Sequence, residues 1–123
     1  MAAAYVFRVE FRLDPDDVRV EPNRFETVLR VPAVRPGEEG WLFFQHNCWG
    51  GTANNKPHLS ERFEDALGVP VSSLDFRELE TDRAYLDALK NAIAADLGRF
   101  NADSVDDVLH NHLGSSIHIR SAD

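Results

Sequence analysis

Period-two alternation dominates the segment Tyr5-Val6-Phe7-Arg8-Val9-Glu10-Phe11-Arg12-Leu13. Large apolar side chains occupy every second position, and charged side chains fall between them in the second half. This spacing predicts a strand with one buried face and one wet face. The following Asp14-Pro15-Asp16-Asp17 predicts where the strand ends, because proline cannot continue a ladder and aspartate favours turns.

Two further strands are predicted before the helices begin. Residues 25–31 alternate in the same way, with Val18-Arg19-Val20 as a lead-in or a short strand of its own. Residues 36–40 have the proline and glycine content of a turn. Residues 41–47 are mostly apolar and predict a third, central strand. We expect the second and third strands to pair antiparallel through that turn.

Apolar spacing of three and four residues then predicts three helices, each closed by a glycine. The first helix spans 59–67 and is closed by Gly68. Thr81 or Asp82 caps the second, which Gly98 ends, and Asp103 or Ser104 opens the third, which Gly114 closes. Residues 69–79 and 115–120 predict strands. The predicted order is β-β-β-α-β-α-α-β. This order indicates an α+β fold, with a largely antiparallel sheet of about four to five strands and two to three helices on one face.

Length and composition indicate a single domain over residues 1–123. The sequence has no run of about 18 apolar residues, so we expect no membrane span. Its N-terminus lacks the basic start and apolar centre of a signal peptide. One cysteine, Cys48, excludes an internal disulfide. We therefore expect a cytoplasmic protein.

Acidic excess is the strongest signal in the composition. Asp and Glu number 21 against 13 Lys and Arg, which gives a net charge of −8, and only Lys56 and Lys90 are lysines. Such a surface repels itself at low ionic strength, whereas molar salt shortens the Debye length to about 3 Å. The composition therefore favours a halophilic source over an acidic mesophilic one. A nucleic-acid partner is not expected, because no basic patch is evident.

Two histidines and the cysteine form a candidate metal site. On a strand, His46 and Cys48 point to the same face, and the loop that follows can bring His58 to them. Imidazole and thiolate are zinc ligands, and the same trio could provide a thiolate nucleophile with a histidine base. We favour the alternative of a buried cysteine acting as a small hydrophobe, because no fourth ligand is evident.

The other histidines favour structural roles. His110 and His112 lie roughly 200° apart around a helix, so they cannot chelate one metal ion. His112 falls on the apolar stripe near the helix C-terminus, which favours a capping or core role. His118 is expected on the final strand.

An aperiodic loop is the candidate ligand-binding site. It contains the aromatic Trp49, the glycines Gly50 and Gly51, and the amides Asn54 and Asn55. Loops on rigid scaffolds often bind ligands, and glycines can present backbone N–H groups to an anion. Gly-Gly alone lacks the phosphate-loop pattern, so the alternative is a connecting loop with Trp49 over the edge of the core.

Four arginines line one face of the first two predicted strands, namely Arg8, Arg12, Arg24 and Arg30. Such a face can contact phosphates. Because Glu10 and Glu26 are interleaved with the arginines, cross-strand ion pairs are the favoured interpretation.

Several segments resemble a known family. They are Tyr5-Val6-Phe7-Arg8, Gly40-Trp41-Leu42-Phe43-Phe44, the Trp-Gly loop, and Leu113-Gly114-Ser115-Ser116-Ile117-His118. Together they resemble the LWR-salt proteins of halophilic archaea over nearly the whole chain. The tripeptide Leu-Trp-Arg that names the family corresponds here to Cys48-Trp49-Gly50, so no role of the family's arginine carries over. The resemblance implies a haloarchaeal source and supplies no mechanism.

From these features we predict a non-enzymatic binding or interaction module. It would associate with itself or with a protein partner through a sheet edge or the Trp49 loop. One alternative is a small enzyme or metal-binding protein that uses His46, Cys48 and His58, with zinc as the metal. The other is a nucleic-acid-associated protein that uses the arginine face. No other cofactor is predicted.

Overall fold

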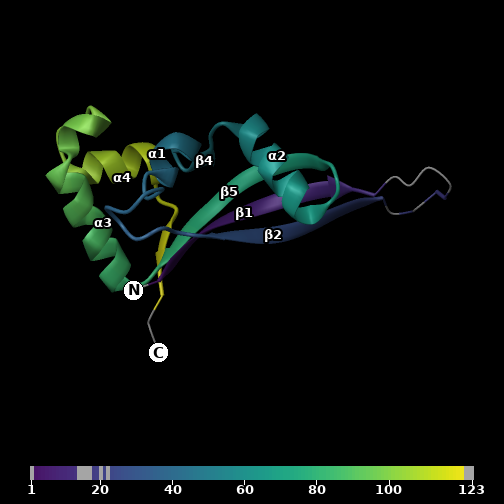
Figure 1. Cartoon of the computed structure of the whole chain (residues 1–123), viewed down its shortest axis with the longest axis horizontal. Coiled ribbons are helices and arrows are strands. Elements are labelled where there is room, and N and C mark those ends of the chain that lie inside the picture. Colours follow the sequence, from purple (N-terminus) through teal and green to yellow (C-terminus); the bar gives the residue numbers. More distant parts are fainter. Residues whose placement is uncertain (1, 14–17, 20, 22, 121–123) are drawn as a thin grey trace.

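The computed structural model describes residues 2–13, 18, 19, 21 and 23–120. Its main sheet has the order β2-β1-β5-β6, in which β1 is antiparallel to both neighbours and β5 is parallel to β6 (Figure 1). These strands are β1 (Ala3–Arg12), β2 (Arg24–Pro32), β5 (Val71–Thr81) and β6 (Ile117–Ile119). The remaining elements are α1 (Phe43–Asn47), β3 (Cys48–Trp49), β4 (Thr52–Ala53), α2 (Lys56–Leu67), α3 (Arg83–Ala95), the 3₁₀ helix η1 (Leu97–Phe100) and α4 (Val105–Leu113). The predicted α+β class is confirmed.

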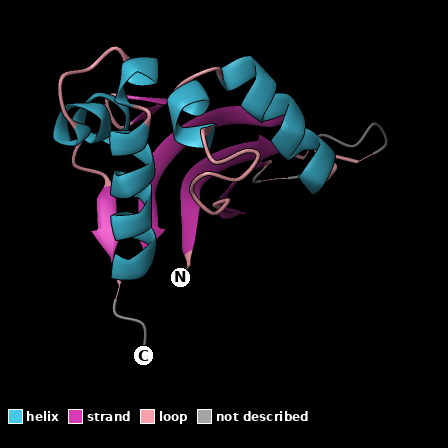
Figure 2. Ribbon diagram, turned by 60° about the vertical axis from the view of Figure 1, so that its left-hand side comes forward, coloured by secondary structure: helices cyan, strands magenta, loops and turns pink. Residues whose placement is uncertain are grey.

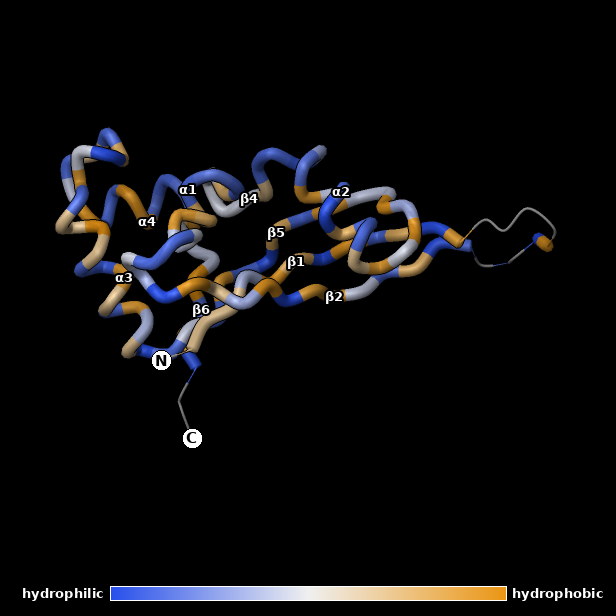
Figure 3. Tube along the Cα trace, viewed as in Figure 1, coloured by the Kyte–Doolittle hydropathy of each residue, from blue (hydrophilic) through white to orange (hydrophobic). Residues whose placement is uncertain are grey.

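The alternation along β1 sets the two faces of the sheet. Tyr5, Phe7 and Val9 are buried against the helices, while Arg8 is exposed on the opposite face. Figure 3 shows the same alternation of apolar and polar residues along the strands. The predicted turn at residues 14–17, and Val20 of the predicted lead-in, lie outside the described residues.

The third strand, predicted over residues 41–47, is wrong. Helix α1 occupies this region, and β1 instead pairs with β2 on one side and β5 on the other. A short apolar run does not distinguish a strand from a buried helix by periodicity alone. As a helical turn the run packs Phe43 on Tyr5 and stacks Phe44 on Phe100, with ring centroids 4.6 and 5.7 Å apart. The predicted pairing of the second and third strands is therefore also wrong.

The predicted helices are confirmed, and their ends follow local chemistry. Asp82 and Ser104 cap α3 and α4 by accepting hydrogen bonds from Tyr85 and Asp107 backbone N–H groups. Gly68 closes α2 in the left-handed conformation, with φ at 73°. Helix α3 ends at Ala95, earlier than predicted, and η1 continues from Leu97. Within the described residues, none of the helices has the length and apolarity that a membrane span needs.

The helices cover one face of the sheet, as predicted (Figure 2). Phe63 of α2 meets Phe7 at a centroid distance of 5.3 Å. Leu89 and Ile93 of α3 and Val108 of α4 are fully buried in the same core. The opposite face of the sheet carries charged side chains.

Candidate interaction surfaces

The Trp49 loop is tied to the end of helix α4. The backbone N–H of Gly50 donates to the carbonyl oxygen of Asn111 at 2.6 Å, and that of Gly51 donates to the carbonyl oxygen of His112 at 3.2 Å. The last carbonyl groups of a helix have no hydrogen-bond donors within the helix, and here the loop provides those donors. The two glycine amides predicted to face an anion are therefore engaged within the chain.

Close packing explains the glycine at position 51. Gly51 has φ at +78°, and a Cβ there would lie 3.1 Å from the carbonyl oxygen of Leu113 and from Ser116 Oγ. Gly50 has φ at +62°, but a Cβ there would meet nothing within 4 Å. The loop backbone at Gly51 thus lies directly on the last residue of α4, where a side chain has no room.

Trp49 stands at the surface and touches one buried residue. The residue is 57% exposed, and its ring makes a T-shaped contact with the His112 ring, with centroids 5.1 Å apart. His112 is buried between Phe44 and Phe100, with its Nδ1 2.9 Å from the carbonyl oxygen of Cys48. A carbonyl only accepts, so Nδ1 carries the proton and donates. The predicted core role of His112 is confirmed.

The two asparagines of the loop lie where the loop leads into helix α2. The backbone N–H of Asn54 donates to the carbonyl oxygen of Asn47 at 2.6 Å, which closes the short β3-β4 hairpin. Asn55 precedes α2 in the left-handed conformation, with φ at 54°. Both side chains are exposed. Binding of a ligand by this loop stays a prediction.

The structure does not bring His46, Cys48 and His58 together. Cys48 is fully buried in the core, whereas His46 on α1 and His58 on α2 are exposed. Among the described residues, no group of three or more His, Cys, Asp and Glu side chains is placed to hold a metal ion. Burial raises the pKa of the Cys48 thiol to about 12, so at neutral pH it is a protonated, apolar side chain. Zinc binding by the trio stays a prediction.

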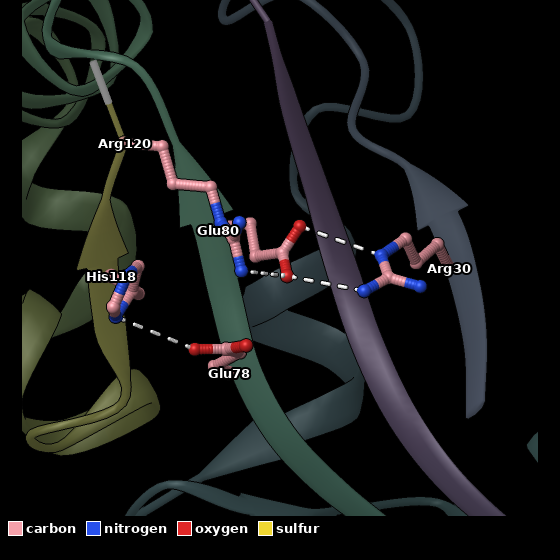
Figure 4. A network of polar contacts seen from close by, with 5 residues as sticks. All are labelled: Arg30, Glu78, Glu80, His118 and Arg120. Atoms are coloured by element: carbon pink, nitrogen blue, oxygen red, sulfur yellow. Dashed lines mark hydrogen bonds and ion pairs between the residues drawn. The ribbon is translucent and has the colours of Figure 1, made fainter.

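Ion pairs cross the open face of the sheet from strand to strand (Figure 4). Arg30 of β2 reaches over β1 and donates to the Glu80 carboxylate of β5 at 3.4 Å, and Arg120 donates to the same carboxylate at 3.0 Å. The Arg30 hydrogen bond is the main reason that the pKa of Glu80 lies below its usual value, and the charges of Arg120 and Arg30 add to it. His118 of β6 faces Glu78 at 3.7 Å.

A second group on this face is centred on Arg8 of β1. Its guanidinium lies 3.3 Å from Asp75 of β5 and 3.8 Å from Glu26 of β2. All three side chains are about half exposed, so each pair adds little to stability. The predicted use of these arginines in cross-strand ion pairs is confirmed for Arg8 and Arg30. Contact of this face with nucleic acid stays an alternative prediction.

The outer edge of β2 is unpaired in the described part of the chain, where β2 is the first strand of the sheet. The N–H of Ala33 donates to the Ala3 carbonyl and the N–H of Leu13 donates to the Asn23 carbonyl, at 2.9 and 2.8 Å. Between these two bonds the β1-β2 register has no bulge. In an antiparallel ladder alternate residues bond inward. The N–H and C=O groups of Arg24, Glu26, Val28 and Arg30 therefore point away from the sheet.

Together these features define a small acidic α+β protein with an ion-paired sheet face, a capped helix end and an open strand edge. The chain belongs to the LWR-salt protein family, whose model matches residues 1–123. The resemblance seen in the sequence is thereby confirmed. No curated protein and no solved structure matches the chain.

Proposed function

We propose that this chain is a non-enzymatic interaction module that binds a protein partner along the outer edge of β2. The observation that carries the proposal is this nine-residue strand, whose outward N–H and C=O groups have no neighbouring strand in the described chain. An extended segment can add to such an edge through backbone hydrogen bonds, with side chains providing selectivity. The other edge strand, β6, has only three residues.

Charge at the edge supports selective pairing. Exposed charged side chains commonly protect an edge from indiscriminate pairing. Here Glu26 lies between Arg24 and Arg30, so both signs occur among the outward residues. Such a pattern repels a strand that presents like charges and attracts one that presents the complementary pattern.

The composition supports the cytoplasm of a halophilic archaeon as the place where the module works. With a net charge of −8, two such chains repel each other over long distances in dilute buffer. Molar potassium chloride reduces the Debye length to about 3 Å, so the repulsion fades while backbone hydrogen bonds across an edge persist. Concentrated salt therefore favours association through this edge.

A proline at position 28 tests the proposal, because the Val28 N–H points outward and makes no bond within the sheet. Proline is tolerated where an edge strand faces solvent, so Val28→Pro should fold and lose only the outward hydrogen-bond donor at position 28. Tagged chain produced in haloarchaeal cells is then sized by gel filtration in molar potassium chloride. We expect wild type in a complex and Val28→Pro as a folded monomer. A complex of unchanged size in Val28→Pro, or a monomeric wild type, would contradict the proposal.

Thr27→Pro is the matched control for strand geometry. Thr27 pairs with Val9, and its N–H points inward to β1. Proline there removes a bond of the native ladder, so this neighbouring change should lower the urea midpoint much more than Val28→Pro.

A further inference from the structure

We propose that the partner of the β2 edge is a second copy of this chain, joined antiparallel about a two-fold axis at Val28. This inference rests on the proposed function and adds the identity of the partner. The two four-stranded sheets would form one continuous sheet through β2 of each copy.

Strand length selects this register. Val28 is the midpoint of β2, which runs from Arg24 to Pro32, so pairing centred there overlaps the two strands along their whole length. The outward residues Glu26, Val28 and Arg30 of each copy then exchange hydrogen bonds with Arg30, Val28 and Glu26 of the other. Any other register leaves part of the edge unpaired.

Charge selects the same register. Pairing centred on Val28 places Glu26 opposite the second copy's Arg30, and the two-fold axis repeats this opposite-charge pair. Within each chain Glu26 faces Arg8 at 3.8 Å and Arg30 faces Glu80 at 3.4 Å, so each side chain would meet a second charge of opposite sign across the edge. Moving the axis to position 26 would oppose two Glu26 carboxylates. Moving it to position 27 would oppose Arg24 and Arg30, and moving it to position 30 would oppose two Arg30 side chains. Like charges directly opposite each other destabilise a strand pair.

The apolar face of β2 fits the same arrangement. Phe25, Leu29 and Val31 are only half-buried in the single chain. In the register centred on Val28, Phe25 lies opposite Val31 and Thr27 lies opposite Leu29. These side chains would bury more apolar surface on the helix side of the joined sheet, while the charged pairs lie on its open side.

Exchanging the charges tests the proposed register. Glu26→Arg alone and Arg30→Glu alone each create two like-charge contacts, so each dissociation constant should rise by roughly tenfold. In a mixture of the two variants every charged contact is opposite again, so the mixture should form a heterodimer. The molecular mass, measured by sedimentation in molar potassium chloride, should be twice 13.9 kDa for wild type and for the mixture. Single variants that dimerise as well as wild type would overturn the register.

Single cysteines provide a second readout, which reports the distance between the same position in the two copies. In a hydrogen-bonded antiparallel pair, opposed Cα atoms lie about 5.5 Å apart, within the range of a disulfide. Oxidised Val28→Cys should therefore form a covalent dimer, and the native Cys48 is buried. Glu26→Cys is the matched control, because its two copies would lie four residues apart along the strands. Crosslinking of Glu26→Cys but not Val28→Cys would overturn the register.

Different results would contradict self-pairing and the use of the β2 edge. If purified wild type is monomeric at every concentration in molar salt and Val28→Cys does not crosslink, self-pairing is wrong. If a cellular complex that Val28→Pro abolishes is still present, the interaction module stands and its partner is another protein. If that complex is also absent, both proposals fail.

Discussion

Adding one methyl group at Gly51 and at Gly50 separates backbone strain from steric crowding in the Trp49 loop. Both residues have φ in the left-handed region, +78° and +62°, where an L side chain costs roughly 1–2 kcal/mol. Gly50→Ala meets nothing else within 4 Å. Gly51→Ala also places its Cβ 3.1 Å from the Leu113 carbonyl oxygen, which belongs to the backbone and cannot rotate away.

The extra crowding should make Gly51→Ala the more damaging change. Overpacking typically adds about 1–3 kcal/mol. We therefore expect losses in the free energy of unfolding of about 1–2 kcal/mol for Gly50→Ala and about 2–5 kcal/mol for Gly51→Ala, the sum of both effects. Urea denaturation in molar potassium chloride, followed by far-ultraviolet circular dichroism, measures both without changing the ionic strength. Equal losses would show that the loop does not rest on the end of α4 as described.

Three further predictions concern buried or paired side chains. Because burial raises the pKa of the Cys48 thiol to about 12, iodoacetamide at pH 8 should label it only as fast as the chain unfolds; rapid labelling of native protein would contradict this burial. Because the pKa of Glu80 is lowered in the folded state, its carboxylate stabilises the fold above its ordinary pKa of 4.5, and this contribution is lost as the pH falls through the lower folded value. Glu80→Gln should therefore flatten the acid side of the plot of urea midpoint against pH, and an unchanged slope would refute the role of the carboxylate. His112→Ala should lower the free energy of unfolding by about 2–5 kcal/mol, because it leaves a cavity and an unpaired Cys48 carbonyl; a loss within error of zero in the same urea assay would be inconsistent with that contact.

The sequence predicted the elements whose periodicity and end signals agree. The alternation of Phe7 and Val9 with Arg8 identifies β1, and Gly68 and Gly114 mark the ends of α2 and α4. The run from Trp41 to Asn47 was misjudged because its side chains pack as a helical turn on Tyr5 and Phe100, contacts that no local pattern encodes. The interleaved charges of the first two strands predicted the Arg8–Glu26 pair, whereas the pairs of Arg8 with Asp75 and of Arg30 with Glu80 depend on β5 lying beside β1.

The candidate surfaces were only partly predictable from the sequence, because they too depend on contacts between residues far apart in the chain. The Trp49 loop was visible as an aperiodic segment, but its contact with α4 joins residues far apart in sequence. β2 is an edge strand because the other side of β1 pairs with β5. That strand begins almost 60 positions after the end of β1, so the pairing cannot be read from local sequence. Once that pairing is known, the alternation of hydrogen bonds between β1 and β2 shows that the even-numbered residues of β2 point outward.

Amide hydrogen exchange at Val28 and Thr27 tests most directly whether the outer edge of β2 is the binding surface. The measurement is made on purified chain in molar potassium chloride over a range of protein concentrations. We predict that the inward Thr27 amide exchanges at one slow rate, while protection of the outward Val28 amide increases with concentration as copies pair. Fast, concentration-independent exchange at Val28 would contradict pairing between copies. The same fast exchange in the presence of haloarchaeal extract would contradict the proposed use of this edge.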